Sequence, residues 1–176
     1  MPLEPEAGAQ AADGVPRRSG TSTRRPQISL RARALKLLAM REHSRQELSR
    51  KLAMHAESQE QLLLLISDLE QSGYLSEQRF AESLVRRRGN GRGASLVAAE
   101  LQQHGIDPEL SGPLLKHLQS SELERARSAW RRKFHGFPSD FTERVKQQRY
   151  LMQRGFSTET IARFFRAMER GELGES

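Results

Sequence analysis

The chain has 176 residues, enough for one ordinary domain or a short array of helical repeats but too few for a large enzyme. It contains no cysteine, which excludes disulfides, cysteine-ligated zinc and thiol nucleophiles. The 29 lysines and arginines outnumber the 22 acidic residues, which gives a net charge of +7. Most of these cations are arginine, and its guanidinium group can pair bidentately with the carboxylates or phosphates of a partner.

Residues 1–28 are predicted to form a disordered tail. They contain four prolines among alanine, glycine, serine and arginine, and no apolar stretch of the kind that a signal peptide requires. The longest strictly apolar run of the chain, Leu62 to Ile66, is far shorter than the roughly 18 residues of a membrane span. We therefore expect a cytoplasmic protein without membrane contact.

A first three-helix unit is predicted over residues 29–75. An apolar stripe with i, i+4, i+7 and i+8 spacing starts the first helix near Ser29. Ser44 and Glu47 have the spacing of a capping box and start the second helix, and the third helix ends at Gly73. The residues expected to face this core are Leu30, Ala34, Leu37, Leu38, Leu48, Leu52, Leu62, Leu65, Ile66 and Leu69.

A second unit is predicted over residues 76–119. Its first helix ends in three arginines, and the glycine-rich stretch 89–93 that follows is interpreted as a flexible hinge. Asp107 caps the last helix of this unit, in which the pair Gly112 and Pro113 predicts a kink or a late start. The expected core residues are Phe80, Ala81, Leu84, Val85, Ala94, Val97, Ala98, Leu101, Leu110, Leu114 and Leu118.

A third unit is predicted over residues 120–171. Ser121 and Glu124 have capping-box spacing and start its first helix. Asp140 starts the second helix, and Ser157 starts the last one. The expected core residues are Leu123, Ala126, Trp130, Phe134, Phe141, Val145, Met152, Ile161, Phe164, Phe165 and Met168.

One corner recurs along the chain as Leu, three residues, Gly and then an apolar residue. It occurs at Leu69–Gly73, Leu101–Gly105 and Leu151–Gly155, and its unequal spacing excludes a strict repeat. No segment shows the alternating pattern of a strand. The sequence therefore predicts an all-α protein of three tandem, degenerate three-helix modules that resemble helix-turn-helix units.

The pattern of polar residues argues against catalysis. The five histidines are scattered without the i, i+4 spacing of metal ligands, and each is interpreted as a surface or cap residue. The glycines of 89–93 lack the strand that a nucleotide-binding motif requires, and helix capping explains the carboxylate pair Glu122 and Glu124. We expect no enzyme activity, no metal and no cofactor.

Clustered basic residues are the most informative feature. A single arginine on a helix is as readily a solvated surface residue, but clustering favours a binding surface for phosphates or acidic side chains. Trp130 and Tyr150 could stack on bases, although their positions on or beside apolar stripes favour core packing. The candidate binding residues are Arg79, Arg86, Arg87, Arg88 and Arg92 in the middle unit, and Arg131, Arg132, Lys133 and Arg149 in the last.

The stretch GYLSEQRFAESLVRRR from Gly73 to Arg88 resembles the signature of the RecX regulatory proteins. The stretches ALKLLAMREHSRQELSRKL, AAELQQHGI, KFHGFP and YLMQRGFSTETI agree with that family in order and spacing, and the likeness spans about Leu30 to Met168. The resemblance implies an elongated, curved array that binds the groove of the RecA filament on single-stranded DNA. It also implies that the protein limits filament extension, recombination and the coprotease activity of the SOS response.

Two functions remain open on the sequence. In the first, a monomer binds RecA, with its cations meeting acidic RecA loops or DNA phosphates, and has weak, sequence-independent affinity for single- or double-stranded DNA. In the second, a sequence-specific regulator reads DNA with the helix Ser157–Arg170, where Arg163 and Arg166 could contact base edges. The large apolar residues of that helix argue against the second function.

Overall fold

The computed structural model describes residues 28–171, so the predicted tail lies almost wholly outside the described part. Nine α-helices, one short 3-10 helix and no strand occur in residues 28–171, as the all-α prediction requires. Within this range every helix is too short or too polar to cross a membrane. The helices are α1 (Leu30–Met40), α2 (Arg45–Leu52), η1 (Ala53–His55), α3 (Gln59–Gln71), α4 (Glu77–Gly89), α5 (Ala94–Gln103), α6 (Pro108–Ser120), α7 (Glu122–Arg131), α8 (Phe141–Gln153) and α9 (Thr158–Glu169).

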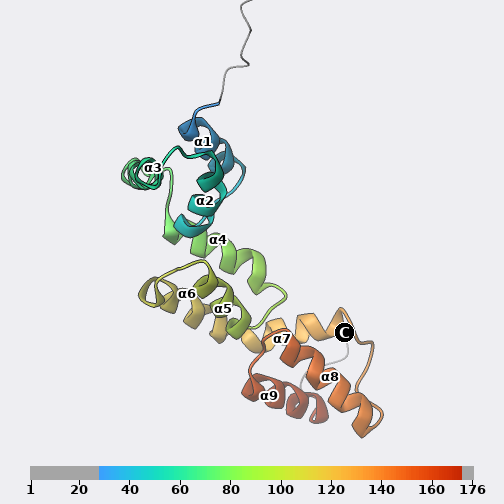
Figure 1. Ribbon diagram of the computed structural model, residues 1–176. Coiled ribbons are helices and arrows are strands. Elements are labelled where there is room, and N and C mark those ends of the chain that lie inside the picture. The colour runs from blue at the N-terminus through green and yellow to red at the C-terminus, as the bar shows by residue number, and fades with distance from the viewer. Residues whose placement is uncertain (1–27, 172–176) are drawn as a thin grey trace, which may run out of the picture.

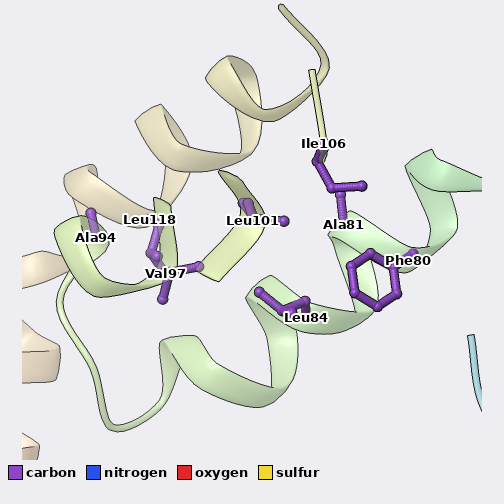
Figure 2. Close-up of a cluster of buried hydrophobic side chains, with 8 residues drawn as sticks. All are labelled: Phe80, Ala81, Leu84, Ala94, Val97, Leu101, Ile106 and Leu118. Atoms are coloured by element: carbon purple, nitrogen blue, oxygen red, sulfur yellow. The ribbon is translucent and has the colours of Figure 1, made fainter. Parts of the chain in front are cut away.

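Three separate hydrophobic cores divide the helices into module 1 (α1–α3), module 2 (α4–α6) and module 3 (α7–α9), which follow one another in an elongated, curved array (Figure 1). Figure 2 shows the core of module 2, where Phe80 and Leu84 of α4 meet Val97 and Leu101 of α5 and Leu118 of α6. Each module buries its own apolar residues, and hydrogen bonds and ion pairs link one module to the next.

Helix starts follow the predicted caps at most positions. The hydroxyls of Ser29, Ser44 and Ser157 each accept a hydrogen bond from the backbone N–H three residues later. The expected cap at Ser121 is wrong, because its side chain instead donates to the carbonyl of Leu118. Ser121 joins two helices with almost no connection, and its backbone (φ −99°, ψ 10°) is not the extended conformation that an N-cap requires.

The recurring corners are confirmed. Gly73, Gly105 and Gly155 have φ values of +72°, +74° and +80°, which a side chain would strain. In the two corners inside modules, the amides of Ile106 and Phe156 donate back to the leucine carbonyl five residues earlier. The corner at Gly73, which joins modules 1 and 2, is one residue longer, and there Leu75 makes the equivalent bond.

Helix α6 shows that packing overrides a local signal. It begins at Pro108 and includes both Gly112 and Pro113, so the predicted late start is wrong. Leu114 and Leu118 hold the helix against α4 and α5, and this burial outweighs the cost of an interior proline.

Helix α8 faces its core differently from the prediction. Phe141 is 79% exposed and Met152 is 54% exposed, whereas Gln147 and Leu151 are fully buried. Gln147 is buried because its side-chain oxygen accepts a hydrogen bond of 2.7 Å from Nε1 of Trp130 on α7. The inward face of α8 therefore combines this polar contact with the apolar packing of Leu151 in the module 3 core.

Candidate functional site

The arginines at the end of α4 divide into two groups. Arg88 and Arg92 both bind Glu100, at 2.9 Å and 3.1 Å, and are engaged within module 2. Arg86 and Arg87 are exposed, and neither has an ion-pair partner in residues 28–171. The guanidiniums that remain available for a partner in this cluster are therefore those of Arg86 and Arg87.

Arg79 joins modules 1 and 2. Its Nε donates to Glu42 at 2.8 Å, and its Nη2 donates to the carbonyls of Gly73 and Tyr74 at 2.9 Å and 3.1 Å. A contact of 3.5 Å between Oγ of Ser44 and Nδ1 of His104 lies at the same junction. The sequence placed Arg79 among the candidate binding residues, and the structure gives it contacts that hold the module boundary.

The glycine-rich segment 89–93 is the junction between modules 2 and 3. Arg125 of α7 donates to the carbonyl of Gly89 at 2.7 Å, and Arg132 donates to that of Asn90 at 2.7 Å. Arg154, after α8, donates to the carbonyl of Gly91 at 3.1 Å. Three guanidiniums from module 3 thus hold successive carbonyls of this segment, which argues against its interpretation as a flexible hinge.

Two backbones meet at the same junction without room for a side chain. The amide of Gly93 donates to the carbonyl of Arg154 at 2.8 Å. A Cβ on Gly93 would lie 1.9 Å from the carbonyl oxygen of Gly155, and one on Gly155 would lie 2.6 Å from the side chain of Leu96. Both glycines are required by this close approach.

Glu122 links three helices at the junction. Its buried carboxylate accepts hydrogen bonds from the amide of Ala94 at 3.1 Å and from the hydroxyls of Ser157 and Thr160 at 2.8 Å and 2.7 Å. Burial acts to raise the pKa of Glu122, but these bonds outweigh it and hold the pKa below its ordinary value. Because Gly93 has no side chain with which to cap α5, Glu122 caps that helix from α7.

A shallow pocket of about 520 Å³ lies beside this junction and is lined by Asn90, Arg125, Ser128 and Arg132. In residues 28–171 neither of the two guanidiniums has an acidic partner within ion-pair distance, and both bind backbone carbonyls instead. The pocket therefore combines two positive charges with neutral polar groups.

The other predicted residues of module 3 lie at its surface. Arg131, Lys133 and Arg149 are exposed, as are Arg163 and Arg166 on α9. Residues 121–170 contain twelve lysines and arginines and six acidic residues. Module 3 therefore carries most of the excess positive charge of the chain.

The aromatic residues take roles that the sequence predicted only in part. Trp130 is 6% exposed and Tyr150 is half-buried with its hydroxyl bound to the carbonyl of Ala129 at 3.2 Å, which confirms core packing for both. Phe137 is 48% exposed and Phe141 is 79% exposed, although their types alone would place them in a core. No local sequence signal distinguishes these two rings from the buried ones.

An ionic cluster of module 1, in which Glu47 and His43 are buried and Arg41 and Lys51 are exposed, corrects the expectation for one histidine. His43 is 1% exposed, with Nδ1 donating to the carbonyl of Arg41 at 2.9 Å and Nε2 accepting from Lys51 at 3.1 Å. Burial acts to raise the pKa of Glu47, but hydrogen bonds from Arg41 and Lys51 lower it to about 2. Within residues 28–171 no three histidine or acidic side chains are grouped so that they could hold a metal ion.

Comparisons with known proteins agree with this modular helical architecture. Residues 76–111 match the second three-helix domain of RecX, and residues 120–165 match the third. A regulatory protein RecX of Herminiimonas arsenicoxydans is 47% identical over 146 residues, which cover 83% of this chain and 97% of that protein. One from Neisseria meningitidis serogroup C is 40% identical over 78% of this chain and 89% of its own length.

The fold is shared with a solved structure. The crystal structure of RecX from Lactobacillus salivarius superimposes with a TM-score of 0.64 at 22% identity, covering 80% of this chain and 95% of that one. The three-helix modules, their order along the chain and the sequence similarity over nearly the full length of the relatives all point to one family. The chain belongs to the RecX family of regulatory proteins.

Proposed function

We propose that this protein is a non-enzymatic, cytoplasmic regulator that binds the RecA nucleoprotein filament and limits its activity in DNA repair, recombination and the SOS response. The observation that carries this proposal is the 47% identity to a regulatory protein RecX over 97% of that protein. An elongated array of small modules supports it, because such a shape offers a long surface to a helical partner.

The proposed mechanism is occupancy of the filament groove. The monomer lies along the groove and bridges neighbouring RecA protomers, so that the filament extends less and turns over less ATP. The hydrogen bonds at segment 89–93 support this mechanism, because they join modules 2 and 3 into one extended surface.

The contacts with acidic RecA loops or DNA phosphates are assigned first to the exposed cations that have no ion-pair partner in residues 28–171, namely Arg86, Arg87, Lys133 and Arg149. Four further arginines are weaker candidates, because each already makes a hydrogen bond within the chain that a partner would have to share: Arg79, Arg88, Arg92 and Arg132. Arg131 is exposed and stays in the proposed surface.

The test is the ATPase activity of RecA on single-stranded DNA with wild-type protein, Arg86→Ala/Arg87→Ala and a control, Arg50→Ala/Lys116→Ala. The control removes the same charge from exposed positions on α2 and α6. We expect the first variant to inhibit RecA at least tenfold less and to show a weaker dependence on salt, because it loses charged contacts. Inhibition equal to that of the control would refute the assignment of this surface.

The competing function, a sequence-specific DNA-binding regulator, is tested with the same protein. Its candidate helix α9 buries Ile161, Phe164 and Phe165 and presents Arg163 and Arg166 to solvent. A mobility-shift titration with random and genomic duplexes distinguishes the two functions. Strong preference for one sequence, together with no effect on RecA, would establish the alternative.

A further inference from the structure

Two phenylalanines of module 3 have exposed side chains. Phe137 lies in the connection between α7 and α8, and Phe141 is the first residue of α8. Among the aromatic residues of 28–171, only these two and Tyr74 are classed as exposed, and Phe141 is the most exposed at 79%. Two large exposed rings on one short segment make this segment a candidate contact surface.

The fold of this segment does not depend on the two rings. Asp140 caps α8 by accepting from the amide of Glu143 at 2.8 Å. The carboxylate of Glu143 accepts from both the amide and the hydroxyl of Ser139, at 2.9 Å and 3.0 Å. These hydrogen bonds and the buried Pro138 hold the segment in place. The two exposed rings are therefore not needed for the segment to fold.

The net charge of module 3 favours an anionic partner, because residues 121–170 contain twelve lysines and arginines and six acidic residues. The two acidic residues of the segment, Asp140 and Glu143, keep their charge but are held in hydrogen bonds to the segment's own backbone and hydroxyl groups. Lys133 before the rings and Lys146 after them are exposed. Lysine is depleted in the cores of protein–protein interfaces, whereas aromatic rings beside exposed cations are the pattern of single-strand binding.

We infer that Phe137 and Phe141 are a stacking site for the unpaired bases of a single-stranded nucleic acid, with Lys133 and Lys146 beside its phosphates. Stacking needs a free base face, so a duplex does not fit this site, and every base has such a face, so no sequence preference is expected. The rings are four positions apart in the chain, which places their Cα atoms at most about 15 Å apart, within reach of a few nucleotides.

The position of the site suits a strand held inside a filament. The α7–α8 connection lies at the end of the array opposite α1 (Figure 1), so module 3 would approach the strand while the other modules bind along the groove. This role rests on the proposed function, but the binding of a single strand does not require RecA and can be measured without it.

The test measures binding of a fluorescein-labelled oligo(dT) of 20 nucleotides by anisotropy over a range of salt concentrations. The variants are Phe137→Ala/Phe141→Ala and Phe137→Leu/Phe141→Leu. The control is Met152→Ala, which removes another exposed apolar side chain from the same face of α8, three turns from Phe141. The fluorescence of Trp130, the only tryptophan and a buried one, reports whether each variant is folded.

We expect each lost ring to weaken binding of oligo(dT) roughly 5- to 150-fold. The leucine variant should lose as much as the alanine variant, because leucine keeps the apolar surface but cannot stack. The logarithmic salt dependence should stay unchanged, because no phosphate contact is removed. Met152→Ala should bind as the wild-type protein does.

Three results would overturn the inference: no measurable binding of oligo(dT) by the folded wild-type protein, wild-type binding by the leucine variant, or unchanged binding of oligo(dT) with loss of RecA inhibition. The last result would make the rings a contact with protein. If the variants lose oligo(dT) while the wild-type protein leaves RecA unaffected, the stacking site stands and the proposed regulation of RecA fails.

Discussion

Replacing Gly93 by alanine isolates the close approach between modules 2 and 3. The backbone of Gly93 (φ −70°, ψ 163°) is acceptable for alanine, so any effect must come from the space around the new methyl group. That group would lie 1.9 Å from the carbonyl oxygen, 2.1 Å from the carbonyl carbon of Gly155 and 2.3 Å from the amide of Phe156. All three are backbone atoms, which cannot move aside as a flexible side chain can.

Relieving this clash requires the two segments to separate by more than 1 Å, since heavy atoms do not approach a Cβ closer than about 3 Å. The separation would break the hydrogen bond of 2.8 Å from the amide of Gly93 to the carbonyl of Arg154. Overpacking costs about 1–3 kcal/mol and a buried unpaired amide about as much again, so we expect a loss of roughly 3–5 kcal/mol. For a chain of this size the melting temperature should fall by roughly 6–20 °C.

Thermal unfolding followed by circular dichroism measures this effect, and Gly112→Ala is the matched control. Gly112 lies inside α6, and a Cβ there meets nothing within 4 Å. Alanine should therefore stabilise the helix by about 0.5–1 kcal/mol, and the melting temperature should rise by about 1–4 °C. Equal effects of the two substitutions would refute the close packing at Gly93, since both exchange the same residues.

Two further predictions concern buried carboxylates. Glu47, whose pKa is lowered from 4.5 to about 2, contributes stability that is fully present above pH 4.5 and is lost as the pH falls toward 2. Urea unfolding between pH 7 and pH 2.5 should show a loss of at most about 3 kcal/mol that Glu47→Gln largely removes, and an equal pH dependence in both proteins would contradict the assignment. Glu122→Ala should lower the free energy of unfolding in urea at pH 7 by at least about 3 kcal/mol, because it leaves the amide of Ala94 and two hydroxyls without their acceptor. Glu124→Ala, which changes an exposed neighbour on α7, should lower it by under about 0.5 kcal/mol.

The helices and their ends follow from local chemistry, which is why the sequence predicts them well. A serine or aspartate cap bonds an amide two or three residues away, as at Ser44, and a glycine at positive φ ends a helix by its own backbone, as at Gly105. Where the local signal failed, the deciding contact came from elsewhere. Ser121 lost its cap role to the direct junction of two helices, and Gln147 was drawn into the core by Trp130, 17 residues away.

The sequence by itself determined the helical class, the corners, the basic character and the resemblance to RecX, because each is written in neighbouring residues. Only the tertiary structure decided which arginines hold the modules together and which lie exposed at the surface. Arg125 and Arg154 reach carbonyls 36 and 63 residues away, and in sequence they look no different from the exposed Arg86. A guanidinium binds a backbone carbonyl or a phosphate with the same donors, so its role depends on which acceptor the folded chain brings within reach.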